Sequence, residues 1–146
     1  MATINTSNFG IAQGRLTKDP VFFDNKDGSK KVMITVAAQD SFKNASGERA
    51  TQFIQLEGFI SNKSNGIGVY AYMHKGDMVN VAYGVRTNNY EKDGKTVYSQ
   101  VLSINGVQLL ETKKNQAART ANAVAAEQAK AEAAEAVADD DAPFEE

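Results

Sequence analysis

The residues of this chain that could do chemistry are aromatic side chains in polar surroundings. Residues 51–59 alternate as a strand does, so Ile54 and Leu56 share one face while Phe53 and Phe59 share the other with polar residues. Rings presented in this way can stack on unpaired bases, because every base has a π-face, and each stack contributes about 1–3 kcal/mol. The alternative is that a loop or a neighbouring subunit covers both rings.

Two further aromatic residues lie in polar segments beside cations. Phe42 precedes Lys43, and Tyr90 lies in a long hairpin with Lys residues at its tip. Aromatic residues interleaved with Lys and Arg are typical of a groove that stacks bases and neutralises phosphates. We therefore predict that Phe42, Phe53, Phe59 and Tyr90 stack on bases. The candidate phosphate contacts are the cations of these segments and of the first turn: Arg15, Lys18, Lys43, Arg86, Lys92 and Lys95.

Residues that could support catalysis or hold a metal are scarce. The chain has no cysteine, and its single histidine, His74, is expected to be a surface or cap residue. No glycine-rich motif that cradles phosphates is present, since Gly66-Ile67-Gly68 alone is too short a signal. We therefore predict a non-enzymatic protein without a metal or a cofactor.

The elements that must position the aromatic residues are short strands separated by turns. Strands are expected at residues 9–16, 31–38, 51–59, 78–85 and 97–110, and Asp93-Gly94 marks the tip of the hairpin between the last two. A short helix is expected near Gly68–Lys75, with Gly76 as its C-terminal cap. This order predicts an all-β fold, a five-stranded OB-fold Greek-key barrel with one short helix between strands 3 and 4, plus a flexible C-terminal tail. Other small barrels and α+β arrangements share the same order of elements.

A change of composition divides the 146 residues into three segments. Residues 1–112 are the predicted OB-fold domain, and their 12 Lys/Arg against 10 Asp/Glu give a charge of +2. Residues 113–138 are alanine-rich and are predicted to be a spacer, disordered or partly helical. From residue 113 onward the counts are 4 and 8, a charge of −4, so a mildly basic body carries an acidic tail. This asymmetry favours a charged partner such as nucleic acid.

The segment 139–146 is an acidic tip that contains one apolar anchor. An aromatic ring among carboxylates suits a partner with a basic-rimmed hydrophobic pocket. The residues predicted to bind such a partner are Asp139, Asp140, Asp141, Pro143 and Phe144. No basic and apolar leader stands at the N-terminus, and no apolar run approaches the roughly 20 residues that cross a bilayer. We therefore expect a cytoplasmic protein with no membrane segment.

The chain resembles the bacterial and phage single-stranded DNA-binding proteins, the SSB family, over roughly Asn8 to Glu111 and again at its tip. The resemblance rests on short motifs that occur in the family's order along the chain. They are Gly14-Arg15-Leu16-Thr17-Lys18-Asp19-Pro20, the strand from Lys31 into Asp40-Ser41-Phe42, Thr51-Gln52-Phe53 through Phe59, Lys75-Gly76-Asp77 and Arg86-Thr87.

The resemblance implies sequence-independent binding and protection of single-stranded DNA in replication, recombination and repair. It also implies a homotetramer, or more rarely a dimer, and recruitment of replication and repair proteins through the tip. Phe42 and Phe53 fall where the family often has tryptophans, Phe59 falls on a stacking phenylalanine, and Tyr90 on an aromatic of the hairpin. The chain departs from the family in having no tryptophan and in the two glutamates that follow Phe144.

Two other functions remain open. An OB-fold adaptor could bind a protein or an oligosaccharide through the same aromatic face, and Glu57 between the two rings would suit it. An RNA-binding module is also consistent, because a stacking platform does not inspect the 2′-hydroxyl unless a group is placed to do so.

Overall fold

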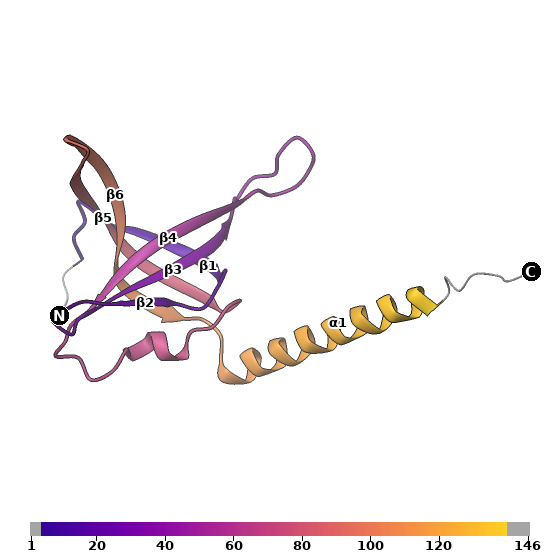
Figure 1. Cartoon of the computed structure of the whole chain (residues 1–146). Helices are drawn as coiled ribbons and strands as arrows, with labels where there is room; N and C mark the ends of the chain where they lie inside the picture. Colours follow the sequence, from indigo (N-terminus) through magenta and orange to yellow (C-terminus); the bar gives the residue numbers. More distant parts are fainter. Residues whose placement is uncertain (1–3, 140–146) are drawn as a thin grey trace, which may run out of the picture. The chain divides into compact units, whose positions relative to one another are not determined.

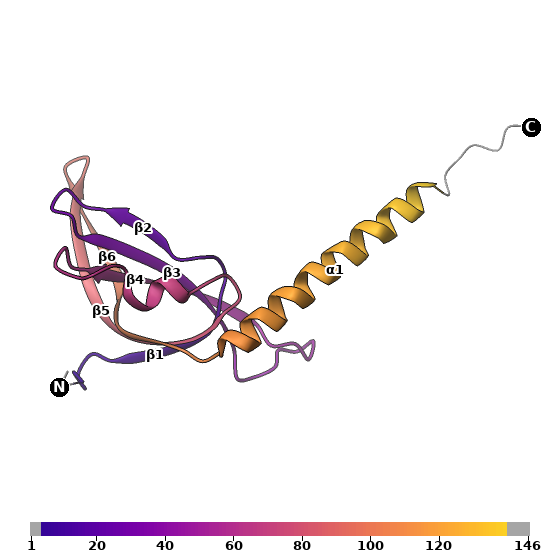
Figure 2. The same cartoon turned by 90° about the horizontal axis from the view of Figure 1, so that it is seen from below.

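The computed structural model describes residues 4–139 of the chain, which fall into two compact units. The first unit ends at Leu110 and the second begins at Glu111. In the first unit the strands cross one another around a common interior (Figure 1), and a view from below shows the same arrangement (Figure 2). All strands of the described residues lie in the first unit, and the long helix lies in the second.

The described strands are β1 (Gly10–Leu16), β2 (Val21–Asp24), β3 (Lys30–Gln39), β4 (Thr51–Ile60), β5 (Met78–Lys92) and β6 (Lys95–Leu109). They hydrogen-bond in the order β1-β5-β6-β4-β3-β2, and β1 pairs also with β3. The β1–β3 pairing joins the two ends of a five-stranded run and closes a barrel, which leaves β2 as an edge strand beside β3. β4 and β6 pair in parallel and all other neighbours antiparallel, so the architecture is consistent with an OB-fold.

The interior of the barrel is apolar and excludes water. Side chains that alternate inward from the strands make up most of this core, Met73 from the segment between β4 and β5 completes it, and burying each one contributes about 1.5–3 kcal/mol. Its fully or almost fully buried members are Leu16, Val32, Ile34, Val36, Leu56, Ile60, Met73, Val79 and Val81.

Closure of the barrel depends on a close approach of β1 to β3. A Cβ built on Gly14 would stand 2.1 Å from the carbonyl oxygen of Ala37. Since that neighbour is backbone, no side-chain adjustment could relieve the clash, and only glycine fits at this position. The following residues, Arg15 and Leu16, then pair with Ala37 and Val36.

Two details of the predicted fold are wrong. There are six strands, because residues 21–24 pair with the first half of β3 through a tight turn closed by the Asn25 N–H and the Ser29 carbonyl, 2.8 Å apart. The segment between β4 and β5 is only a 3-10 turn, η1 (Gly68–Tyr72), whose cap is the extended Met73 and not Gly76. Gly68 begins it with a φ of +61°, which is not helical, and no side chain caps its first turn. The one α-helix of the described residues, α1 (Lys113–Asp139), lies at the C-terminal end.

The turn that contains Ser29 is ordered by side-chain hydrogen bonds. The Ser29 hydroxyl and the Ser29 N–H both donate to Asp27 Oδ1, at 2.6 and 3.0 Å. These two bonds, from the hydroxyl first and the backbone second, hold the pKa of Asp27 below its usual range. Because the turn carries Asn25, its order also places that residue beside the site described below.

Helix α1 covers 27 residues, more than the partial helix expected for the spacer. Its N-terminus is capped by the Thr112 hydroxyl, which accepts from the Asn115 N–H at 3.3 Å, and Arg119 pairs with Glu111 at 3.2 Å. No apolar stripe runs along it, so its stability comes from the helix propensity of alanine and not from packing of one face. Within residues 4–139, no helix combines the length and the apolar character needed to span a membrane.

Candidate nucleic-acid interface

The outward face of β4 carries two of the predicted stacking residues. Phe53 and Phe59 are 69% and 72% exposed, whereas Leu56 on the inward face is fully buried. The predicted alternation of this segment is therefore confirmed. Phe53 and Phe59 are six residues apart on one strand, so the two rings mark the ends of a strip about 20 Å long.

Cross-strand pairing places cations in register with these rings, and residues in register across neighbouring strands are called a row below. Arg15 of β1 is in register with Ala37 of β3, which is in register with Phe53 of β4. Lys31 of β3 is likewise in register with Phe59. Because residues directly opposite each other in antiparallel strands share a face, each row combines one aromatic ring with one cation.

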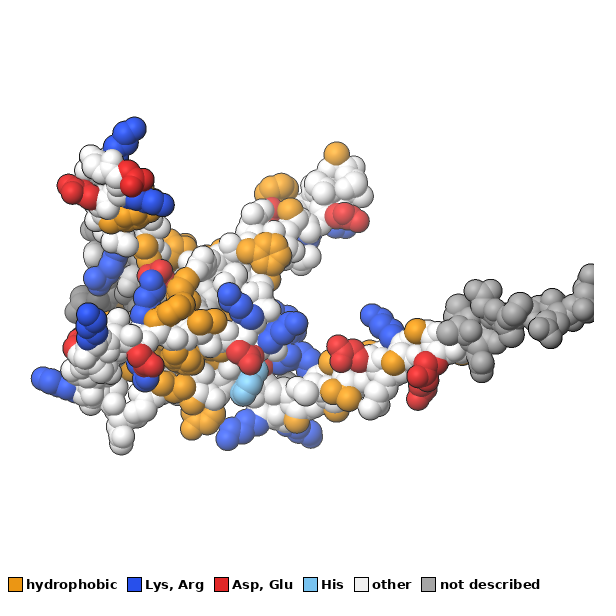
Figure 3. Space-filling view, in the orientation of Figure 1, with side chains coloured by type: hydrophobic (Ala, Val, Ile, Leu, Met, Phe, Trp, Pro, Cys, Tyr) orange, Lys and Arg blue, Asp and Glu red, His pale blue; other side chains and the backbone are white. Residues whose placement is uncertain are grey.

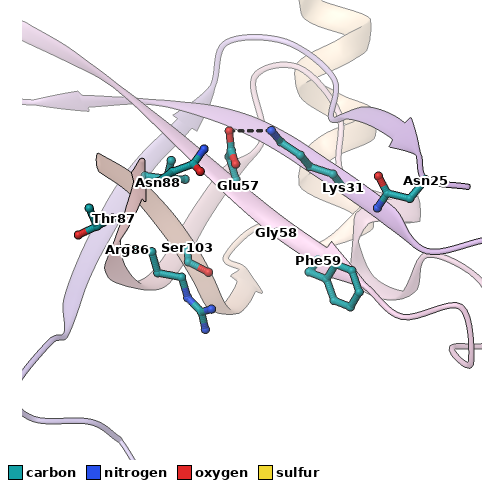
Figure 4. Close-up of a pocket in the computed structure, with 10 residues that line it drawn as sticks. Asn25, Lys31, Glu57, Gly58, Phe59, Arg86, Thr87, Asn88 and Ser103 are labelled. Carbon is teal, nitrogen blue, oxygen red and sulfur yellow. Dashed lines mark ion pairs between the residues drawn. The ribbon is translucent and has the colours of Figure 1, made fainter. Parts of the chain in front are cut away.

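A pocket of about 360 Å³ opens beside Phe59, between β4 and the β5–β6 hairpin. Glu57 and Lys31 point toward each other at its rim, with 3.0 Å between the carboxylate oxygen and the ammonium nitrogen (Figure 4). Arg86 lines the same pocket, so the structure brings together one predicted stacking residue and one predicted phosphate contact. The remaining lining residues are Asn25, Gly58, Thr87, Asn88, Val101 and Ser103.

The β5–β6 hairpin extends this surface away from the barrel. Its tip is a two-residue turn with positive φ at both Asp93 (+52°) and Gly94 (+74°), as the predicted Asp-Gly turn requires. Lys92 and Lys95 flank the turn and are cross-strand neighbours in register. Alternation along β5 puts the half-exposed Tyr90 on the same face of the hairpin as Arg86.

The loop between β3 and β4 carries Phe42 and Lys43, both exposed. Its tip is compact, because the Asn44 side-chain oxygen accepts from the backbone N–H groups of Ser46 and Glu48, at 3.1 and 2.9 Å. In the space-filling view the loop and the β5–β6 hairpin rise as two arms on either side of a broad saddle (Figure 3). Apolar side chains line parts of both arms, and Lys and Arg side chains lie over the barrel below.

Some predicted residues are placed differently. Arg15 donates from a guanidinium nitrogen to the Gly76 carbonyl at 2.9 Å, so it also holds the turn before β5 against β1. Lys18 lies in the exposed bend between β1 and β2, outside the rows that carry the rings. Asp140, Asp141, Pro143 and Phe144 lie outside the described residues, and Asp139 ends α1.

The structure adds residues that sequence reasoning missed. Phe23 of β2 is in register with Lys31 and is 48% exposed, so it extends the row of Phe59 and Lys31 by one more ring. Tyr98 of β6 is 77% exposed, but it is in register with Asn89 and so faces away from Tyr90. The sequence could have predicted this orientation, because Tyr98 alternates with Val97, Ser99 and Val101 and so lies on the opposite face of the strand from them. Nothing local to β2 or β3 could have paired Phe23 and Lys31 with Phe59.

The arrangement suits the binding of flat, negatively charged ligands. Exposed rings, cations in the same rows and an open pocket can stack flat ligands and neutralise their charge. No group of three or more His, Cys, Asp or Glu that could hold a metal ion occurs among residues 4–139.

Comparisons with known proteins agree on one kind of protein. The model of the Single-strand binding protein family matches residues 8–110. "Single-stranded DNA-binding protein 1" of Staphylococcus aureus (strain MSSA476) is 36% identical over 107 residues, which are 73% of this chain and 67% of the relative. "Single-stranded DNA-binding protein 3" of Listeria innocua is 38% identical over 106 residues, 72% of this chain and 64% of the relative. The match of the family model covers every strand of the barrel.

Proposed function

This chain belongs to the single-strand binding protein family, and from that premise we propose that it binds and protects single-stranded DNA with little regard to sequence. The observation that carries the proposal is the pair of exposed rings, Phe53 and Phe59, on the outward face of β4, with Lys31 and Arg86 beside Phe59. Phe42 and Tyr90, and Phe23 in addition, extend the stacking surface. The role is one of binding and not of catalysis, in replication, recombination and repair.

The phosphate contacts in this proposal come from the cations around the saddle. Arg86 lines the pocket with Phe59, Lys43 follows Phe42, and Lys92 and Lys95 form the hairpin tip. Arg15 shares a row with Phe53, while Lys18 stands apart and contributes least. Each cation that neutralises a phosphate releases a counterion, so affinity should decrease as salt increases.

The experiment that tests this function is a salt titration of binding to labelled oligo-dT and to a duplex of matched length. We expect strong preference for oligo-dT and a slope of log affinity against log salt of about −0.7 for each phosphate contact. Equal affinity for the duplex, or binding to oligo-dT that does not respond to salt, would contradict the proposal. Oligo-rU in the same titration tests the RNA-binding alternative, which tighter binding to oligo-rU would favour.

We also propose that the protein assembles into a homotetramer, or a dimer, in the cytoplasm of a bacterial or phage-infected cell. Two features of the described residues support assembly. Residues 10–14 of β1 pair with β5 on one side only, and Ile11 on the outward face of β1 is 58% exposed. The solution mass, measured on the sample used for the titration, gives the number of subunits.

The proposed tip function is separate from the barrel. Residues 139–146 combine carboxylates with Pro143 and Phe144, and we propose that they recruit replication or repair proteins. Phe144 is followed by Glu145 and Glu146, so a partner meets an internal phenylalanine with a neighbouring carboxylate side chain. The adaptor alternative predicts that a protein binds through Phe53 and Phe59 instead.

A further inference from the structure

Glu57 is the residue of the interface that phosphate binding does not explain. It stands on the outward face of β4, two residues before Phe59, and its side chain is 28% exposed. A carboxylate in a groove for a polyanion repels the phosphates, which weakens binding. Its position beside a stacking ring therefore calls for another role, and the groups around it indicate which one.

The carboxylate is held in place and only partly neutralised. Lys31 reaches Glu57 Oε1 at 3.0 Å, which orients the carboxylate and leaves its other oxygen without a partner in that ion pair. In the view of Figure 4, Asn88 lies on one side of Glu57 and Lys31 on the other, and all three line the pocket with Phe59. Glu57 and Lys31 thus present a hydrogen-bond acceptor and a donor side by side.

A base stacked on Phe59 would bring its edge to this pair. Residues two apart on a strand are about 6.6 Å apart, so the edge of a pyrimidine over Phe59 comes within reach of Glu57. Cytosine presents an amino group and, next to it, a ring nitrogen that accepts, which complements a carboxylate beside an ammonium. Uracil and thymine present a carbonyl oxygen at the position of the amino group, and this oxygen would face the carboxylate.

We propose that Glu57, oriented by Lys31, makes the Phe59 pocket a subsite that selects cytosine over uracil or thymine. This inference rests on the proposed function, because it concerns one subsite of the same DNA groove. Glu57 is a specificity-determining residue in this proposal, while stacking and phosphate contacts supply most of the affinity. The alternative is that Lys31 and Glu57 form a structural cross-strand ion pair that contacts no base.

The test compares oligo-dC with oligo-dU of equal length, at a pH where cytosine is neutral, for the native protein and for Glu57→Gln. The two bases differ only at the amino or carbonyl group and the adjoining ring nitrogen. We expect the native protein to prefer oligo-dC roughly threefold to tenfold, at the low end of hydrogen-bonded base discrimination because the pocket is open to water. Glutamine can both donate and accept at this position, so the preference should fall to about twofold or less in the variant.

Gln55→Ala is the matched control, since Gln55 lies on the same face of β4 but does not line the pocket. It should change the affinity for both oligonucleotides by the same factor. If the native protein binds both equally, or if Glu57→Gln strengthens both by one factor, Glu57 acts only as a charge and the inference is overturned while the proposed function stands. If neither oligonucleotide binds, the proposed function fails as well.

Discussion

The barrel and helix α1 differ in what holds each side chain in place. In the barrel, large apolar side chains such as Ile34 and Leu56 are fully buried, and pairing between distant strands fixes the register of every outward residue. In α1 the apolar positions are mostly alanine, and the largest of them with a described exposure, Val124, is 47% exposed. The barrel therefore holds its outward rings and cations in defined positions, because a packed interior positions the strands that carry them.

The same contrast appears in the charges. Charge in the barrel is placed in rows with aromatic residues, as Lys31 with Phe59 shows. In α1 the first turn has no acidic residue and the last turn no basic one, so its charges oppose the helix dipole. Beyond its first turns, where Thr112 caps it and Arg119 pairs with Glu111, the helix is therefore stabilised mainly by the propensity of alanine, which suits a spacer better than a binding surface.

The largest expected effect is on DNA affinity when both rings of β4 are removed. Replacing Phe53 and Phe59 together by alanine deletes two stacks of about 1–3 kcal/mol each, so affinity for oligo-dT should fall by at least about thirtyfold. Because both rings are exposed, the melting temperature should hardly change. Fluorescence anisotropy and thermal unfolding measure the two quantities on one sample.

Tyr98→Ala is the control for that double variant. Tyr98 is as exposed as the two phenylalanines, but it lies on the opposite face of the hairpin from Tyr90. Its removal should change the affinity for oligo-dT by less than about twofold, because it forms no stack in the groove. The comparison holds for a variant with the same solution mass as the native protein. Binding that survives the Phe53 and Phe59 change in a folded protein would instead favour the adaptor function.

The next largest effect is on the free energy of unfolding, which should respond differently to a substitution in each of the two units. Leu56→Ala leaves a cavity in the barrel and should lower the free energy of unfolding by about 2–5 kcal/mol. Val124→Ala in α1 also removes apolar atoms, but from an exposed position, so the change should stay within about 0.5 kcal/mol. Chemical denaturation at one protomer concentration compares them. A similar loss for both would show that α1 packs as the barrel does.

The sequence could predict those features of the fold that follow a local pattern. Alternation assigned Phe53 and Phe59 to the outward face, and Asp93-Gly94 marked the hairpin tip, because both depend on residues close together in the chain. Strand β2 was missed because four residues carry too little alternation, and it forms only by pairing with β3. Helix α1 is longer than the partial helix predicted for the spacer, because helix propensity alone does not fix where a helix without an apolar stripe begins.

The candidate site likewise has features that the sequence could predict and features that it could not. The types and the exposure of Phe42, Phe53, Phe59 and Tyr90 could be read from the chain, because each stands among polar residues. The pairing of Lys31 with Glu57 could not, since 26 positions separate them in the chain and a shift of one residue in register would turn one of the two inward. The pocket beside Phe59 depends on that register and on the hairpin that packs across it.

The smallest effect is expected when the second unit is removed. A chain that ends at Thr112 loses α1 and the acidic tip, which together carry a charge of −4. The barrel should unfold at the same temperature, since its core lies wholly before Leu110. Affinity for oligo-dT should rise roughly twofold to fivefold at low salt, because the acidic segment no longer competes for the basic groove, and should equal that of the full chain at high salt.

The control restores residues 113–138 without the tip. This chain should keep the gain in affinity, because five of the eight acidic residues removed lie in the tip. If the gain disappears with the spacer restored, the helix and not the tip is the segment that opposes DNA.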